Sequence, residues 1–426
     1  MNRKIVKGRG KMTIAKRLVA TLSLSLMLLL SNRPAHAEES IVYPVAKAAN
    51  EFAVDIYKRL SKSPENIFFS PHSISLALAI TAAGARGDTA AQMKNVLHVG
   101  SIPGDTLDGF AALQSSVANT KGIQLTIANS LWYEQQYPLT KDYTELISSK
   151  YEAQLEAADF LHAAETVASK INLWVENRTH QLIKEIVQPH QLTSDTRLVL
   201  VNAIYFKAHW GKEFSKTATR SEPFKELDGG SGSVQMMQKT EWYQYFENEF
   251  LQMVELPYKD NSTPPLMYNS DNMSMVVILP RKTDGLRELE TSVTELDISS
   301  WLSQVRVKHI ELRLPRFRIE AGKNLAPHLI EMGMSDAFQI GKADFSGMDG
   351  TKTLCISDVL HKAFIDVDEQ GTEAAAATAV LVVKGKYIDR EKPIVFTADH
   401  PFLFLIRHRP SGAILFMGRL GKPAGA

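Results

Sequence analysis

The stretch that most constrains how this chain can fold is an almost unbroken apolar run at residues 198–206 (LVLVNAIYF). Its one clearly polar residue is Asn202. A strand with a single face in the core alternates apolar and polar residues, whereas a strand covered on both faces is apolar throughout. The run therefore predicts a central strand in a large sheet that is covered on both sides.

A second buried element is expected at residues 74–83 (ISLALAITAA), which are apolar nearly all round a helix. Such a helix must be buried on most of its sides. Ser70 and Pro71 give it a start signal, because serine caps helix N-termini and proline fits the first helical turn. Gly84 marks the expected end of this helix.

The rest of the chain divides into a helical front half and a back half rich in strands. Apolar residues recur at helical spacing in residues 46–60 and 168–187. Residues 228–233 are typical of a Gly/Ser-rich surface turn, and we find no repeat or domain linker. The expected fold class is α+β with large sheets. Strand patterns occupy residues 124–133, 251–256, 273–279, 309–314, 355–367, 395–396, 402–406 and 414–418.

The N-terminus has the pattern of a secretory signal. Residues 3–17 carry basic side chains and no acid, residues 18–30 are apolar, and a small-x-small sequence ends at Ala37. The apolar run is shorter than the roughly 20 residues needed to cross a bilayer. We therefore expect residues 1–37 to be cleaved and residues 38–426 to form one domain. The protein should be secreted or periplasmic, without a stable membrane anchor.

Composition and motifs exclude several functions. Lys plus Arg number 48 against 47 for Asp plus Glu, without long blocks of one sign, which argues against nucleic acid as a partner. No nucleophile elbow, His-Glu-x-x-His pair, phosphate loop or Gly-x-Gly-x-x-Gly is present. We predict no enzymatic activity, no metal and no cofactor. The single Cys355 lies in an apolar stretch and is expected to be a buried, inert thiol.

One segment fits neither the helical nor the strand pattern. Residues 369–379 (EQGTEAAAATA) follow a strand and are rich in small residues, and no obvious structure follows until about Ile394. Loops of this length inside compact proteins are usually functional or disordered. Taken alone, the alanines would favour a helix or a flexible linker.

Six motifs give this segment a different meaning, because they occur in the order and rough spacing of the serpin family. Together they span nearly the whole chain after residue 37, which thus resembles a serpin. The resemblance implies three β-sheets, eight or nine helices and an exposed reactive loop near the C-terminus. It also implies a suicide substrate: a protease cuts the loop and stays bound as an acyl-enzyme while the loop inserts into the main sheet. The motifs are residues 66–73 (NIFFSPHS), 84–89 (GARGDT), 200–210 (LVNAIYFKAHW), 344–348 (DFSGM), 361–363 (HKA) and 399–404 (DHPFLF).

The composition of the expected hinge is compatible with insertion. An inserted strand turns alternate side chains into the core, and a Lys or Arg there would bury a charge. Thr372, Ala374, Ala376 and Thr378 form the inward set and are small. Thr372 is expected to be exposed in the intact loop. The alternative is a non-inhibitory serpin-like binding or carrier protein, which would tolerate bulky or charged inward residues. The hinge residues are Glu369, Gly371, Thr372, Ala374, Ala376 and Thr378.

Two further groups match family positions. Asn202 and His361 are lone polar residues on apolar strands and need partners. With Ser70 and Ser73 they match a polar cluster beneath the sheet that gates its opening; the alternative is four unrelated residues that are satisfied locally. Trp210 and Arg316, together with Glu369, match the region where insertion begins.

The bond that is cut determines which protease is inhibited. Counting from Glu369 by family spacing points to Gly385, whereas counting back from the DHPFLF motif points near Arg390. The two counts differ because the loop is longer than usual. Lys384 and Lys386 each offer a long cation to a trypsin-like pocket, so we rank them first, Gly385 next and Arg390 last. The expected partner is a serine-type endopeptidase, or a cysteine one, in a covalent acyl complex with a monomeric inhibitor.

Overall fold

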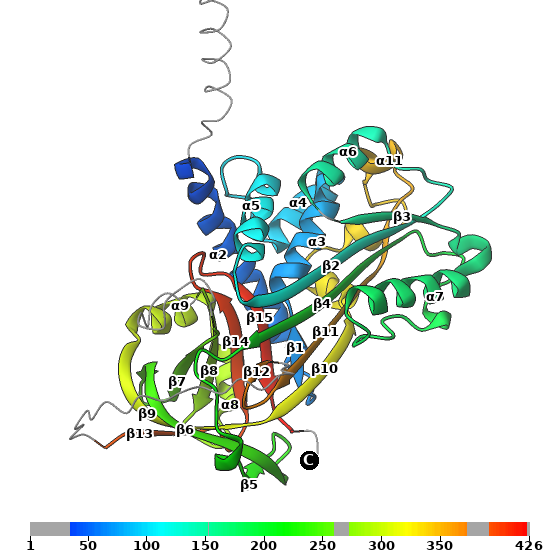
Figure 1. Ribbon diagram of the computed structural model, residues 1–426. Coiled ribbons are helices and arrows are strands. Elements are labelled where there is room, and N and C mark those ends of the chain that lie inside the picture. Colours follow the sequence, from blue (N-terminus) through cyan, green and yellow to red (C-terminus); the bar gives the residue numbers. More distant parts are fainter. Residues whose placement is uncertain (1–34, 152, 260–271, 373–391, 424–426) are drawn as a thin grey trace, which may run out of the picture. The chain divides into compact units, whose positions relative to one another are not determined.

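The computed structural model describes residues 35–423, except residue 152 and residues 260–271 and 373–391 (Figure 1). The chain divides into two compact units, residues 1–41 and residues 42–426, and the account below concerns the second. The predicted signal peptide, residues 1–37, lies almost entirely outside the described residues. Within the described ranges, no helix is both long and apolar enough to cross a membrane.

A six-stranded sheet has β4 near its centre. Residues 198–206 of β4 are all buried, which confirms the central strand predicted from the apolar run. Strand β4 pairs directly and in parallel with β11, from Leu198 opposite Ile356 to Tyr205 opposite Phe364. Strand β12 separates these two strands at one end only. In spatial order the sheet consists of β10 (Phe317–Asn324), β11 (Ile356–Val367), β12 (Gly371–Thr372), β4 (Leu198–His209), β2 (Ile123–Glu134) and β3 (Gln154–Ala158).

A nine-stranded sheet contains most of the strands of the back half. Every strand predicted between residues 251 and 418 is present, in this sheet or as β11. Strand β5 (Arg220–Lys225) pairs with β6 beside the main path of the sheet. That path runs β1 (Ile67–Phe69), β15 (Ile414–Leu420), β14 (Phe402–His408), β8 (Met273–Pro280), β7 (Leu251–Pro257), β6 (Ser231–Glu247), β9 (Arg306–Pro315) and β13 (Ile394–Thr397).

The described strands form two sheets, where three were expected. Strand β6 explains the difference, because it is 17 residues long and pairs with three neighbours. It pairs with β5 over residues 231–236, with β9 over residues 236–245 and with β7 over residues 244–247. It thereby joins strands that would otherwise form separate sheets.

The described residues contain ten α-helices, more than the eight or nine expected. Several are short: α8, α10 and α11 have seven, six and four residues, too few to show an apolar period in the sequence. The helices are α2 (Ala35–Leu60), α3 (Pro71–Ala83), α4 (Gly87–Val96), α5 (Thr106–Ala118), α6 (Lys141–Lys150), α7 (Phe160–Arg178), α8 (Leu286–Ser292), α9 (Glu295–Gln304), α10 (Ala326–Glu331) and α11 (Ser346–Asp349).

Helix α3 begins and ends as the sequence predicts. The Ser70 hydroxyl oxygen accepts a hydrogen bond from the Ser73 amide at 3.2 Å, Pro71 occupies the first turn, and Gly84 is the C-cap. The helix packs against β2 and β4 of one sheet and against β15 of the other. Contact with both sheets explains why its side chains are apolar nearly all round.

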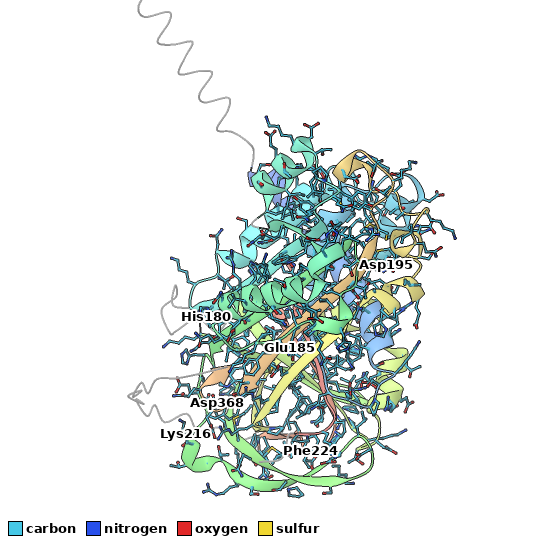
Figure 2. The ribbon with its side chains drawn as sticks, turned by 90° about the vertical axis from the view of Figure 1, so that its right-hand side faces the viewer. His180, Glu185, Asp195, Lys216, Phe224 and Asp368 are labelled. Atoms are coloured by element: carbon cyan, nitrogen blue, oxygen red, sulfur yellow. The ribbon has the colours of Figure 1, made fainter. Side chains whose placement is uncertain are left out.

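Helix α7 ends earlier than the predicted boundary at residue 187. It stops at Arg178 because His180 and Gln181 adopt left-handed backbone conformations, with φ of 52° and 65°. The following segment runs back over the sheet, and the Asn172 side chain holds it by bonding the amide and carbonyl of Val187. In Figure 2, α7 lies in front of the six-stranded sheet, with Glu185 below it. The apolar period continues past the helix because this segment also packs on the core.

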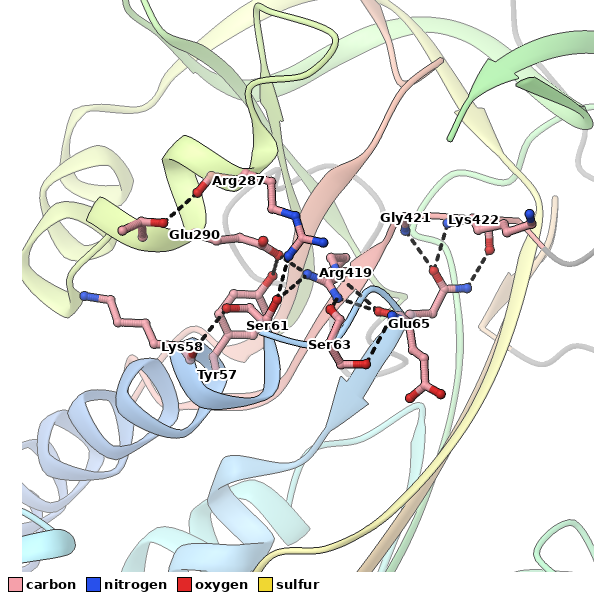
Figure 3. A network of polar contacts seen from close by, with 12 residues as sticks. Tyr57, Lys58, Ser61, Ser63, Glu65, Arg287, Glu290, Arg419, Gly421 and Lys422 are labelled. Atoms are coloured by element: carbon pink, nitrogen blue, oxygen red, sulfur yellow. Dashed lines mark hydrogen bonds and ion pairs between the residues drawn. The ribbon is translucent and has the colours of Figure 1, made fainter. Parts of the chain in front are cut away.

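A buried ion pair fixes β15 to the helices beside it (Figure 3). The guanidinium of Arg419 lies 2.7 Å from the Glu290 carboxylate on α8, and both side chains are buried. Tyr57 on α2 donates its hydroxyl hydrogen to the same carboxylate at 2.7 Å. Arg419 also donates to the carbonyls of Ser61 and Glu65 after α2. The C-terminal strand is thus anchored where α2 and α8 meet.

Candidate functional site

The first residues of the predicted hinge already lie inside the six-stranded sheet. Strand β12 pairs antiparallel with β4, through Gly371 opposite His209 and Thr372 opposite Ala208. On its other side, Thr372 pairs with Val367 of β11. Asp368 stabilises the turn between β11 and β12. Its carboxylate accepts hydrogen bonds from the backbone amides of Gln370 at 2.8 Å and Gly371 at 3.1 Å.

Position 371 has room only for glycine. A Cβ atom at this position would collide with the carbonyl oxygen of Ala208 and the Cα of His209 on β4. The missing side chain therefore lets the backbone approach β4 closely enough to form the pairs of β12.

Thr372 is fully buried, so the expectation that it is exposed in the intact loop is wrong. Its side chain has 0% exposure because β12 lies between two strands. The Thr372 hydroxyl is 2.8 Å from the Tyr258 hydroxyl, within hydrogen-bonding distance. Burial raises the pKa of Tyr258 far above its usual range, so that its hydroxyl stays neutral.

Trp210, predicted at the start of insertion, contacts the turn that precedes β12. Its amide donates to the carbonyl of Gln370, and its indole Nε1 donates to the carbonyl of Asp368, both at 2.9 Å. The ring stacks on Tyr258 with a centroid distance of 4.8 Å. The stacked rings of Trp210 and Tyr258 thus lie beside residues 368–372 and form hydrogen bonds with them.

Glu369 and Arg316, the other residues predicted for this region, also lie together. Glu369 is buried, and its side chain accepts a hydrogen bond from the Thr219 hydroxyl at 2.6 Å. The guanidinium Nε of Arg316 lies 3.8 Å from the same carboxylate. The Glu369 carbonyl accepts the amide of Phe214 at 2.8 Å. We call residues 368–372, with Trp210, Thr219, Tyr258 and Arg316, the hinge site.

The four residues predicted as a gating cluster come together beneath the sheet. His361 on β11 lies directly opposite Asn202 on β4. The Ser70 amide donates to Nε2 of His361 at 3.2 Å, so Nδ1 carries the ring hydrogen and donates to Oδ1 of Asn202 at 2.6 Å. Burial lowers the pKa of His361 to about 3, which keeps the ring neutral. The Asn202 amide donates to the hydroxyl of Ser73.

The cluster also contains a residue that the sequence did not reveal. Asn129 on β2 lies directly opposite Asn202. The side-chain amide of Asn202 donates a hydrogen bond to the side-chain oxygen of Asn129. The Ser70 hydroxyl donates to the carbonyl of Leu415 on β15 at 2.7 Å. The cluster therefore links three adjacent strands of one sheet, helix α3 and the second sheet.

The remaining predicted site residues lie outside the described part of the chain. They are the hinge residues Ala374, Ala376 and Thr378 and the bait candidates Lys384, Gly385, Lys386 and Arg390. Within the described residues, no group of three or more His, Cys, Asp or Glu side chains could hold a metal ion. Cys355 is buried, and burial raises the pKa of its thiol.

The α+β architecture of this chain is that of the serpin class of folds, as the likeness to solved structures shows. A family model described as serpin (serine protease inhibitor) matches residues 47–423. An uncharacterised serpin-like protein of Thermococcus kodakarensis is 40% identical over 382 residues, covering 89% of this chain and 86% of the relative. The leukocyte elastase inhibitor of Equus caballus is 37% identical over 391 residues, with coverage of 89% and 99%.

Solved structures show the same likeness. A thyroxine-binding globulin complex with thyroxine matches with a TM-score of 0.78 and 26% sequence identity, over 90% of this chain and 100% of that one. The family match and the relatives together show that the chain belongs to the serpin family.

Proposed function

We propose that the chain is a secreted inhibitor of serine-type endopeptidases that acts as a suicide substrate. The position of β12 is the observation that carries this proposal. Gly371 and Thr372 already pair with their neighbours where β4 and β11 part. A cut loop would lengthen an existing strand, so insertion needs no new starting point in the sheet.

Insertion of the cut loop is favourable because it replaces one pair of hydrogen-bonded strands, β4 with β11, by two such pairs. Strands β4 and β11 pair directly in parallel below β12, whereas β12 is antiparallel to both. An inserted strand would replace the one parallel interface by two antiparallel ones, a net gain of roughly one ladder of hydrogen bonds. About a dozen bonds at about 1 kcal/mol each supply on the order of 10 kcal/mol. This is comparable with the stability of a whole domain, enough to distort a bound protease.

The gating cluster lies across the interface that has to open. The hydrogen bond between His361 and Asn202 joins β11 to β4, and Ser70 and Ser73 tie the same point to α3. Parting of the two strands must break the bond between His361 and Asn202. We propose that these residues set the barrier to insertion and have no catalytic role.

The proposed target is a trypsin-like protease, recognised through Lys384 or Lys386, with Gly385 and Arg390 as lower-ranked bait residues. A long cation at the cleaved bond suits a pocket that carries an acid. Export would follow cleavage after Ala37, because the N-terminal sequence has the basic, apolar and small-x-small pattern of a signal peptide. The name of the relative from Equus caballus, a leukocyte elastase inhibitor, supports a protease as the partner.

The rival function is ligand binding or transport, which the likeness to a thyroxine-binding globulin favours. Inhibition is preferred because Thr372 and the residues expected to follow it into the core, Ala374, Ala376 and Thr378, are all small. No large or charged side chain would therefore oppose insertion at these positions.

Incubation with active trypsin and denaturing gel electrophoresis test the proposal. We expect a covalent complex, and mass spectrometry of the C-terminal fragment locates the cut. Two variants form a matched pair: Ala376→Arg puts a charge into the inward set, whereas Ala377→Arg puts it into the outward set. The first should be cut and released, and the second should still form the complex. Equal trapping by both variants would contradict insertion, and a wild-type chain that is cut without forming a complex would contradict inhibition.

A further inference from the structure

Three exposed apolar side chains lie on three adjacent strands of the nine-stranded sheet. They are Trp242 on β6, Val307 on β9 and Val395 on β13, exposed to 40%, 49% and 54%. Isolated exposed apolar residues are ordinary on a protein surface, whereas a contiguous group of them marks an interaction site.

The strand register places these residues on one face. Trp242 lies opposite His309, and Val395 lies opposite Glu311. Side chains alternate along a strand, so residues 307, 309 and 311 of β9 point to the same side. Residues 310, 312 and 314, which point to the other side, are fully buried. The exposed residues Trp242, Val307 and Val395 and the partly exposed His309 therefore lie on one side of the sheet, which we call the β13 face.

The β13 face contains a stacked aromatic pair, with polar groups at one side. The rings of Trp242 and His309 stack with a centroid distance of 5.2 Å and an interplanar angle of 24°. At one side, the Glu311 carboxylate accepts hydrogen bonds from the Gln238 side chain at 3.1 Å and from Arg313 at 2.8 Å. An aromatic group with a polar rim beside it is typical of a protein interface.

Chain continuity identifies the partner. Strand β13 is the first strand described after the proposed bait residues, and Val395 follows Lys386 by nine residues. Even a fully extended chain of this length spans at most about 32 Å. A protease domain of about 230 residues has a radius of gyration of about 17 Å, so its diameter exceeds this tether. A protease bound at Lys386 is therefore held close to β13, the strand that carries Val395 of the β13 face.

We propose that the β13 face is a second docking surface for the target protease, which contacts it through an apolar surface loop beside the active-site cleft. This inference rests on the proposed function. The contact forms before the loop is cut, and its role is to hold the protease in the orientation that cleavage requires. It adds affinity that a free peptide with the loop sequence cannot have.

The test measures non-covalent binding to trypsin whose nucleophilic serine is replaced by alanine. Trp242→Ala should weaken binding about tenfold or more, as is usual for a central interface tryptophan. Trp242→Phe, which keeps an aromatic ring, should retain most of the affinity. Leu173→Ala on α7 is the matched control, because Leu173 is an exposed apolar residue (58%) on an element outside the β13 face, and it should bind like wild type. An unchanged unfolding midpoint of each variant shows that folding is intact.

The possible results separate this inference from the inhibitory function. Equal binding by wild type and Trp242→Ala overturns the β13 face, whether or not active trypsin is trapped. Binding that depends on Trp242, combined with cleavage by active trypsin but no covalent complex, supports the face and overturns inhibition. A wild-type chain that neither binds the inactive enzyme nor is cut by the active one overturns both. Self-association that is lost in Trp242→Ala would assign the face to a second copy of the chain instead.

Discussion

Replacing Thr372 by valine tests whether a specific hydrogen bond holds the hinge in the sheet. Valine keeps the branched shape of threonine but has no hydroxyl, so the buried Tyr258 hydroxyl would lose this partner. An unsatisfied buried hydroxyl costs about 1–3 kcal/mol. The cost falls on the state in which β12 is paired, because only there are the two hydroxyls held together.

The expected magnitudes define a double-mutant cycle. Thr372→Val and Tyr258→Phe should each weaken the pairing of β12 by about 2 kcal/mol, which is roughly a 30-fold change in the opening equilibrium. The double variant has neither hydroxyl, so its loss should be smaller than the sum by about 1–2 kcal/mol. Thr240→Val is the control, because Thr240 is exposed on β6 and its replacement should change nothing at β12.

Hydrogen exchange at the amides of Gly371 and Thr372 is the assay, since exchange there reports the free energy of local opening. Protection should fall in both single variants and partly recover in the double variant. Unchanged protection in both single variants, or losses that add without recovery, would refute a hinge held by the hydroxyl pair.

Three further predictions concern the gate, the buried histidines and the buried ion pair. His361→Ala leaves Asn202 and the Ser70 amide without the ring, and it should destabilise the chain by about 3 kcal/mol and promote polymerisation on mild heating, detected by size-exclusion chromatography. The control His190→Ala, at an exposed position, should do neither, and a monomeric His361→Ala protein would argue against a gate. Burial lowers the pKa values of His72 and His408 to about 4 and of His361 to about 3. The unfolded chain binds protons at these histidines below about pH 6.5, whereas the folded state does not. The free energy of unfolding is therefore unaffected by them above about pH 6.5, and it falls toward pH 3–4 by about 1.4 kcal/mol per pH unit for each histidine. His72→Leu, which removes a ring without hydrogen-bond partners in the described structure, should flatten the loss measured in urea between pH 7 and 5; an equal slope would contradict this. Arg419→Met leaves the buried Glu290 carboxylate without its cation and should lower the free energy of unfolding in urea by about 3–5 kcal/mol. Arg281→Met, at an exposed ion pair, should lower it by less than about 1 kcal/mol. Equal losses in the two variants would contradict the effect of burial.

The elements that could be predicted from the sequence are those whose burial follows from the composition of the segment itself. The apolar run at residues 198–206 indicated the central strand β4, and the serine and proline before residue 74 indicated the start of α3. The contact between Asn202 and His361 was predictable in part, because a lone polar side chain on an apolar strand needs a partner.

Features that depend on contacts between distant segments could not be predicted in this way. Tyr258 and Thr372 are 114 residues apart, and Arg419 and Glu290 are 129 residues apart, so no local pattern links either pair. The burial of Thr372 was missed for the same reason, because it depends on where β4 and β11 separate rather than on the residues of the loop. Fusion of the sheets through β6 likewise depends on the length of one strand and the positions of its three neighbours.

The stability of the chain after a single cut between residues 380 and 390 tests most directly whether the hinge is the start of an inserting strand. Intact and cut protein are compared by thermal unfolding under the same conditions. Extension of β12 should add on the order of 10 kcal/mol, which for a domain of this size corresponds to a rise in Tm of roughly 10–15 °C. Cut protein that melts at the temperature of the intact chain would contradict the account.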